Sequence, residues 1–263
     1  LAILPGNAEL ISAHAVFDAI SGNPSPAVDN ELLRAVGMNP RDAEALMALA
    51  LCITAAHAQV GVVRTLEGDV RVFSGQPECA PRFGLDINEG DAVRTGSKSW
   101  AVLAMMDGTR ITVRPDTEVR IDAYRHTDGG EVAQNQARFT LSRGAVRVMA
   151  GRIAGGRNAG FLVVTPDATL DMRGTDQDVA FVGPKFTAPE TELGTYAKVN
   201  AGGAVLRNAG GEVKLAVGQA AIAESAKRVA PRLLPSDPYF FHWHNYIDRR
   251  AAAVIDKLDA ETQ

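Results

Sequence analysis

The chain has 263 residues, of which 46% are hydrophobic and 22% charged. This length and apolar content are enough to bury a core in one large domain or two smaller ones, and the composition excludes a wholly disordered chain. The formal net charge of −4 lies entirely in residues 1–58, which hold six acidic and two basic residues, whereas the rest holds 25 of each. A neutral body gives no electrostatic reason to expect nucleic acid or an anionic membrane as the main partner.

The N-terminal region contains an apolar run, Leu46–Ala58, that ends in Ala56-His57-Ala58. This ending matches the small-residue cleavage rule of signal peptides, and the run is shorter than the ~20 residues that span a bilayer. We therefore predict that residues 38–58 are a signal peptide cleaved after Ala58. Residues 1–37 are then expected to be a poorly ordered or non-native extension, and the mature chain to be periplasmic or secreted from a bacterium.

Two other interpretations of this region remain. The segment between Met38 and the run holds a single positive charge, Arg41, against Asp42 and Glu44, which is weak for a signal peptide. A buried amphipathic helix is the alternative. Alternatively, residues 1–45 form a small cytoplasmic domain and residues 46–58 a membrane anchor, although the length of the run argues against this.

The chain has two cysteines, Cys52 and Cys79. Because Cys52 lies in the predicted signal peptide, Cys79 would be alone in the mature chain, as a buried thiol or as an intermolecular partner. The spacing of potential ligands supports neither a zinc site nor a redox pair.

From Val60 to Glu224 the sequence alternates apolar and polar residues between dense turn signals, which predicts a mainly β domain over residues 59–225. A motif of an apolar, a basic and an apolar residue recurs, with its aliphatic side chains expected in the core and its cations on the solvated face. Asp107-Gly108 between two apolar runs is the best single hairpin signal. The motif occurs at Val70-Arg71-Val72, Val119-Arg120-Ile121, Val146-Arg147-Val148 and Val213-Lys214-Leu215.

Many short strands without long intervening helices favour a short-stranded antiparallel β-sandwich or a β-solenoid-like fold. After Ser225 the character changes: residues 226–238 are Pro-rich and are expected to form a linker. Residues 239–263 have helical spacing and are expected to form one amphipathic helix that packs on the β body or on a partner. The expected apolar face holds Phe240, Trp243, Ile247, Ala251, Val254 and Leu258.

An ordered series of fragments over about residues 60–182 resembles the FecR domain family. The series contains Ile87–Gly96, Asp107-Gly108-Thr109, Arg114–Val119, Gly144–Val148, Phe161–Ala168 and Arg173–Val179. Its signature residues, for which we expect a structural role, are Gly90, Asp91, Thr95, Gly96, Asp107, Gly108, Arg173, Gly174, Thr175 and Asp176.

Elementary chemistry suggests what the signature residues do. Gly90-Asp91 is expected to form a tight turn in which the Asp side chain caps backbone amides. Gly96 and Gly108 suit turn positions with positive φ. Arg173 and Asp176 are expected to hold two strands together as an Arg–carboxylate pair.

The resemblance implies an extracytoplasmic part of a sensor that relays a signal from an outer-membrane transporter to a cytoplasmic sigma factor. Such sensors carry an N-terminal anti-sigma region and one transmembrane helix. This chain departs from that plan, because its apolar run is short and ends in a cleavage-like site. A periplasmic interaction module is therefore implied more firmly than a membrane-anchored anti-sigma regulator.

The sequence shows no phosphate-binding loop and no G-x-S-x-G elbow, and we expect neither catalysis nor a cofactor. His242 and His244 are two residues apart, so on a helix they point to different faces and make a poor metal pair. Asp176 and Asp178 are expected to share one side of a strand and to pair with Arg173 rather than to act as an acid pair. Nearby Asp167 and Asp171 leave a weak Ca²⁺ site open.

Three functions compete at this point. The first is a protein-interaction module in envelope signalling or assembly, with a protein partner, no nucleic acid and no membrane span in the mature form. The second is a module that binds a ligand such as a cell-wall glycan or a ferric chelate. The third is a hydrolase, which would need a deep cleft lined by Asp176, Asp178 and His126. The sequence does not determine the partner or the oligomeric state.

Overall fold

A computed structural model of the chain describes residues 59–73, 78–79, 84–127, 135–154, 160–184, 191–225 and 229–261. The predicted extension, the signal peptide and Cys52 lie outside these residues. Cys79 lies in a two-residue strand whose side chains are not described. The elements are β1 (Gln59–Glu67), β2 (Val70–Phe73), β3 (Glu78–Cys79), β4 (Asp86–Asn88), β5 (Ala92–Thr95), β6 (Trp100–Met105), β7 (Arg110–Val113), β8 (Glu118–Arg125), β9 (Gln136–Met149), β10 (Gly160–Val164), β11 (Thr169–Val182), β12 (Gly194–Asn208), β13 (Gly211–Leu215), β14 (Ala220–Glu224), β15 (Arg232–Leu233) and α4 (Tyr239–Glu261).

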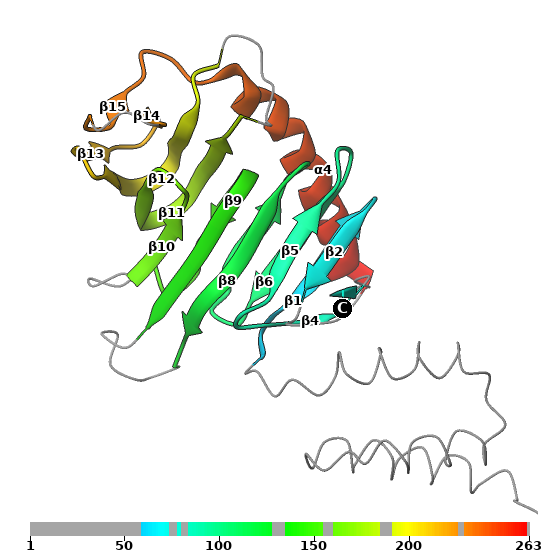
Figure 1. The fold of residues 1–263 in the computed structure, drawn as a ribbon. Helices are drawn as coiled ribbons and strands as arrows, with labels where there is room; N and C mark the ends of the chain where they lie inside the picture. The colour runs from blue at the N-terminus through cyan, green and yellow to red at the C-terminus, as the bar shows by residue number, and fades with distance from the viewer. Residues whose placement is uncertain are drawn as a thin grey trace, which may run out of the picture. The chain divides into compact units, whose positions relative to one another are not determined.

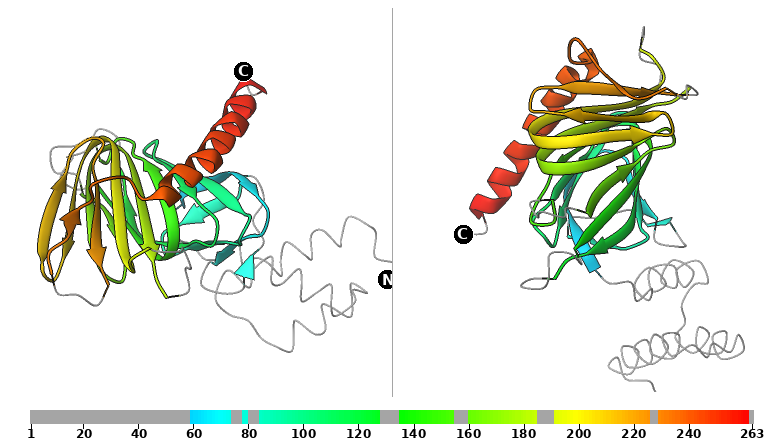
Figure 2. Two further views of the ribbon diagram at one scale, coloured as in Figure 1. Left: turned by 90° about the horizontal axis from the view of Figure 1, so that it is seen from above. Right: turned by 90° about the vertical axis from the view of Figure 1, so that its left-hand side faces the viewer.

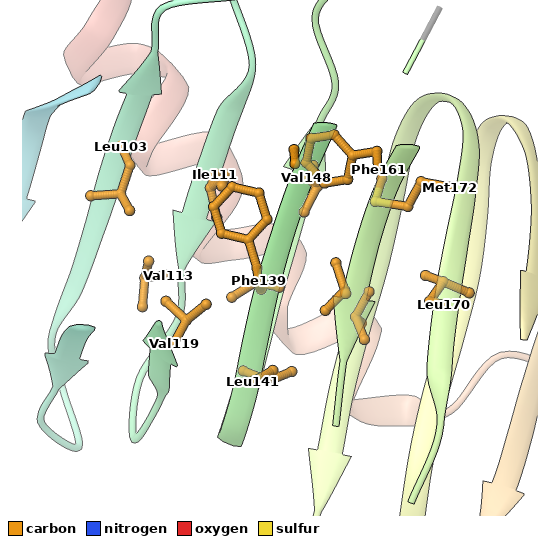
Figure 3. Packing of buried hydrophobic residues seen from close by; sticks show 14 of the residues in the cluster. Leu103, Ile111, Val113, Val119, Phe139, Leu141, Val148, Phe161, Leu170 and Met172 are labelled. Atoms are coloured by element: carbon orange, nitrogen blue, oxygen red, sulfur yellow. The ribbon is translucent and has the colours of Figure 1, made fainter. Parts of the chain in front are cut away.

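Residues His57–Ser74 and Ala80–Gln263 form one compact unit. It is mainly β with a C-terminal helix, as the sequence predicts (Figure 1). The alternating side chains of its strands meet in one apolar core, where the rings of Phe139 and Phe161 stack with their centroids 5.4 Å apart. Figure 3 shows Leu103, Ile111 and Leu170 contributing to the same core from three different strands.

Three long strands connect the two layers that enclose this core. Residues Gln136–Thr140 of β9 pair with β8 and with β10, whereas Val146–Met149 pair with β7 and with β11. Likewise, β11 pairs with β10 along one half and with β9 along the other, and β12 pairs with β13 along one half and with β14 along the other. The strands β11 and β12 also pair with each other along both halves. The sheet therefore folds over on itself, and the same strands contribute to both of its layers.

Glycines make the crossing of β11 and β12 possible at the point where both strands bend. Gly174 has a φ of 151° and Gly202 a φ of 86°, and a Cβ on Gly202 would lie 2.3 Å from the Cα of Gly174. No other residue type fits this approach, because any side chain would collide with the backbone of the opposite strand.

The structure corrects three details of the predicted architecture. The strands are not uniformly short, since β9, β11 and β12 have 14, 14 and 15 residues. The sheet is not purely antiparallel, because β10 pairs with β9 in parallel. The predicted linker, residues 226–238, contains β15, which pairs with β14.

The helix α4 lies outside the strands, on the outer face of the layer that contains β6, β7 and β14 (Figure 2). This position explains one exception to the expected outward cations. Arg71, Arg120 and Lys214 are exposed as predicted, but Arg147 is covered by α4 and only 24% of its side chain is exposed. Within the described part of the chain, no helix is both long and apolar enough to cross a membrane.

Candidate functional site

The contact between α4 and the sheet has an apolar part at each end. Near the start of α4, Phe240 and Phe241 pack on Ala145, Ala180 and the ring of Tyr196. Burial raises the pKa of Tyr196 to about 12, and its hydroxyl donates to the Glu192 carbonyl at 2.8 Å.

Further along the helix, Ile247, Ala251 and Ile255 pack on Trp100 and Val102 of β6. Burial of apolar surface at both ends attaches the helix, but because this effect is non-directional it fixes the register of the helix less sharply than hydrogen bonds do.

An ionic cluster lies between the two apolar parts, and Arg114 is its most deeply buried member. Its side chain has no exposed surface. Nε donates to Asp248 Oδ1 at 3.3 Å, and Nη2 donates to Asp248 Oδ2 at 2.7 Å and also to Asp178 Oδ1. Arg114 directly follows β7, Asp178 lies in β11 and Asp248 in α4. The guanidinium therefore joins the helix to two strands.

Arg147 extends the cluster from the neighbouring strand β9. It makes a bidentate pair with Asp176 at 2.9 and 2.6 Å and reaches Asp248 Oδ2 from Nη1 at 3.2 Å. The hydrogen bond with Asp176, together with the surrounding carboxylates, raises the pKa of the Arg147 guanidinium above its usual value. Asn200 of β12 donates to Asp178 at 2.7 Å and to Asp176 at 3.3 Å.

Every carboxylate oxygen of the ionic cluster accepts a hydrogen bond from within the cluster. Each of the six oxygens of Asp176, Asp178 and Asp248 accepts a hydrogen bond from Arg114, Arg147 or Asn200. Because buried charges are tolerated only when paired and hydrogen-bonded, this geometry sets the register of α4 on the sheet.

Alternation along the strands places the cluster where it is. In β9, Val146 and Val148 point into the core, so Arg147 between them points to the outer face. In β11, Gln177 and Val179 are buried inward, so Asp176 and Asp178 share the outer side. The prediction that these two aspartates lie on one side of a strand is confirmed.

Comparison with known proteins identifies the central part of the β body. Residues 91–188 match the family model described as FecR protein. This region is a FecR domain. The strand residues of the cluster, Arg114, Arg147, Asp176 and Asp178, all lie inside the matched region, whereas Asp248 lies outside it. No curated protein matches the chain.

Solved structures show weaker likenesses. Two crystal structures of a candidate anti-sigma factor from Parabacteroides distasonis, at 2.50 and 1.65 Å resolution, have 14% sequence identity and a TM-score of 0.42. Each match covers 56% of this chain and 60% of that protein's chain. A structure described as a cell surface anchoring domain matches 24% of this chain and 83% of its own, with 30% identity and a TM-score of 0.23.

Two signature residues of the FecR domain, Thr95 and Gly96, support the segment around Arg114. The Thr95 hydroxyl donates to the Arg114 carbonyl at 2.5 Å and accepts from the Thr117 amide at 3.1 Å. The Gly96 carbonyl accepts from the Asp116 amide at 3.1 Å. Gly96 does not have the positive φ that we predicted; a Cβ there would instead lie 3.4 Å from Asp69 and Ser99.

Four further signature residues organise turns as expected. The Asp91 carboxylate accepts from the Asn88 amide at 2.8 Å, and Gly90 has a φ of 94°. Asp107-Gly108 connects β6 to its antiparallel neighbour β7, and Gly108 has a φ of 88°.

The buried Asp107 carboxylate makes more contacts than a turn requires. It accepts from the Tyr124 hydroxyl at 2.6 Å, from the Thr109 amide and hydroxyl at 2.9 Å each, and from the Ile153 amide at 3.1 Å. Burial alone would raise the pKa of Asp107, but these hydrogen bonds outweigh it and hold the pKa below its ordinary value. Burial together with the Asp107 hydrogen bond raises the pKa of Tyr124 well above its usual range.

The predicted pairing of Arg173 is wrong in its partner. Arg173 contacts Asp171 at 3.1 Å on the same strand and is half-exposed, whereas Asp176 and Asp178 pair with Arg147 and Arg114. The physical reason is the bend at Gly174, which separates Arg173 from the outer face that carries the two aspartates. Thr175 lies between Gly174 and Asp176 in β11, and its side chain is not described.

Sequence reasoning missed Asp248, Asn200 and the role of Arg147. Asp248 is separated from Arg114 by 134 residues, and no local pattern links them. The available signal was an aspartate beside Ile247 on the predicted apolar face of the helix, where a charge needs a buried partner.

In the part of the chain that the structure describes, the remaining acidic and histidine side chains do not gather into a metal site. Among the described residues, no three His, Cys, Asp or Glu side chains gather as metal ligands. Asp167 and Asp171 line an open depression of about 510 Å³. However, the Asp167 carboxylate accepts a hydrogen bond from the Ser225 hydroxyl at 2.5 Å, and Asp171 pairs with Arg173. His242 is exposed, and the side chain of His244 is not described.

Proposed function

We propose that this chain is an exported, non-catalytic FecR-type module that binds another protein of the bacterial envelope during signalling or assembly. The observation that carries the proposal is the FecR domain at residues 91–188. The equal numbers of acidic and basic residues from Gln59 onward support a protein partner rather than a polyanion.

The chemistry of the ionic cluster supports a structural role for its aspartates. Asp176 and Asp178 share one side of β11, but every oxygen of both accepts a hydrogen bond from an arginine or from Asn200. A general acid or base needs a carboxyl group that can reach a substrate, whereas Asp176 is paired with Arg147 and Asp178 is buried against Arg114.

Affinity capture tests the binding role. Purified chain, immobilised on beads, is incubated with an envelope extract, and bound proteins are identified by mass spectrometry. We expect at least one protein to be enriched over beads that carry an unrelated exported β domain of similar size and charge. Enrichment of none would contradict the proposed function.

Export is tested separately by the mature N-terminus. After expression of the chain in a bacterial host, the proposal requires a periplasmic product that begins at Gln59. A cytoplasmic product that retains residues 1–58 would reject export and reopen the membrane-sensor interpretation.

A further inference from the structure

The outer face beneath α4 has a layout suited to a helix of one particular kind. We use the term helix-binding face for the surface formed by Ala145, Ala180, Val182, Tyr196, Ile222, Arg114, Arg147, Trp100 and Val102. Its first five residues form an apolar patch and the last two form a second, with the two arginines between them. Such a face is complementary to a helix that carries one acid between two apolar segments.

Hydrogen-bonding complementarity at the centre of this face is specific for a carboxylate. Three donor atoms, Nε and Nη2 of Arg114 and Nη1 of Arg147, converge on the single carboxylate of Asp248 at 2.7–3.3 Å. The same arginines neutralise Asp176 and Asp178 on the sheet, so the sheet side of the cluster is neutral without Asp248. The arginine donors provide geometric recognition of a carboxylate, which an apolar surface does not.

The attachment of α4 is separate from the main core. The core that joins the two β layers contains no residue of α4, whose apolar side chains belong to two smaller clusters on the outer face. Burying the charges of the cluster costs solvation free energy that offsets much of the attraction between them, so the cluster selects its helix more than it stabilises it. Release of α4 therefore leaves the β body with its own core.

We propose that the helix-binding face recognises acid-bearing amphipathic helices, and that α4 is the occupant in cis which a helix of the partner protein replaces. This rests on the proposed function and names the class of partner. By analogy with α4, the partner helix has a large apolar residue two turns before an aspartate or glutamate and smaller apolar residues one and two turns after it, as in Phe241, Asp248, Ala251 and Ile255.

Hydrogen exchange of the wild-type chain provides the first test. If α4 is released while the β body stays folded, amides of Phe241–Ala251 exchange at least about tenfold faster than core amides of β9 and β11, because they open by a lower-energy route. Equal protection of α4 and these strands would show that the helix leaves only on global unfolding and would overturn the proposal.

Exchange in trans provides the second test. The probe is a fluorescent peptide with the sequence of Tyr239–Glu261, titrated into the full chain and followed by anisotropy. We expect it to bind an Asp248→Asn chain at least about tenfold more tightly than the wild-type chain, because the helix in cis competes less well. Circular dichroism of the variant verifies that its β body is folded.

Two matched peptides give the test its specificity. An Asp248→Asn peptide is expected not to bind, whereas a Tyr246→Ala peptide is expected to bind normally, because Tyr246 is 60% exposed and faces away from the sheet. An Ile255→Ala chain, which loosens α4 but keeps Asp248, is expected to accept the peptide as well. Failure of the unmodified peptide to bind either variant chain, or binding that ignores Asp248, would overturn the proposal.

Capture from envelope extracts separates this proposal from the proposed function. The Asp248→Asn chain should capture more of the partner than the wild-type chain does. Equal capture by both leaves the proposed function standing and rejects the helix-binding face as the site. If neither chain captures a protein but the peptide still replaces α4, the proposed function is rejected and the exchange of helices on this face stands.

Discussion

Arg114 has no exposed surface, so its charge depends entirely on protein groups for solvation. We predict that Arg114→Ala lowers the free energy of unfolding by about 3–5 kcal/mol, because it leaves Asp178 and Asp248 as buried carboxylates short of donors. Arg94, half-exposed and paired with Glu118 at 2.9 Å, is the control, and Arg94→Ala should cost less than about 1 kcal/mol. Urea denaturation of both variants measures the difference, and equal losses would contradict a buried role for Arg114.

Asp107 gives a pH-dependent prediction whose sign follows from its lowered pKa. In the folded chain its pKa is below the ordinary 3.8, so its stabilising contribution is complete above that pH and is lost as the pH falls through the folded-state pKa. We therefore expect Asp107→Asn to destabilise the chain by about 1–3 kcal/mol near neutral pH.

The difference between the wild type and Asp107→Asn should shrink below pH 3.8. Unfolding free energies measured over a pH series check this window. Asp69, whose side chain is 66% exposed, provides the Asp69→Asn control, for which only a small effect on stability is expected. A gap between wild type and Asp107→Asn that stays constant into acid would argue against ionised Asp107 as the stabilising form.

At the residue scale, local contacts were predictable from the sequence and distant ones were not. The Asp91 and Asp107 turns involve partners within three residues, so the turn signal alone indicated them. The partner of Arg173 was mispredicted because the bend at Gly174 changes which face of β11 points outward. Asp248 was missed because only the folded chain brings it to Arg114.

At the scale of elements, the bend shared by β11 and β12 depends on bare backbone at Gly202. We predict that Gly202→Ala costs about 1–3 kcal/mol more than Gly218→Ala, because a Cβ at Gly202 overlaps the backbone of Gly174. Gly218 is a matched control: its φ of 80° is close to the 86° of Gly202, but nothing lies within 4 Å of a Cβ there. The difference between the two variants in thermal or urea unfolding measures the cost of the steric overlap alone. Equal costs would show that glycine is required at position 202 for its positive φ and not for the close approach of the two strands.

Periodicity predicted the strands but not their partners. Alternation identified β2, β8, β9 and β13 through the apolar-basic-apolar motif, because side-chain period reports which face is buried. It carries no information on which strand lies next in the sheet, so the parallel pairing of β9 with β10 was not foreseen. For the same reason, the burial of Arg147 under α4 was not predicted, because alternation shows that its side chain points outward but not that a helix packs over it.

At the scale of the whole molecule, the resemblance predicted the β body and the helical period predicted α4, but neither indicated where α4 packs. That position depends on the joint fit of two apolar clusters and one ionic cluster, none of which is local in sequence. The chain therefore has two levels of cohesion: one core shared by both β layers, and a smaller attachment that adds the helix.

This division leads to a prediction about unfolding. Trp100 lies 2% exposed in the cluster beneath α4, and the chain has one other tryptophan, Trp243. In a Trp243→Phe variant, fluorescence therefore reports the environment of Trp100 alone. We expect its emission to shift to the red at a lower urea concentration than the loss of β-sheet circular dichroism, because α4 is released before the main core opens.

Adding Asp248→Asn to that variant should move the fluorescence transition to still lower urea and leave the circular dichroism transition nearly in place. The reason is that Asp248 contributes to the attachment of α4, while the core between the β layers contains no α4 residue. Coincident transitions by both probes, in both variants, would instead show that the helix and the β body unfold as one cooperative unit.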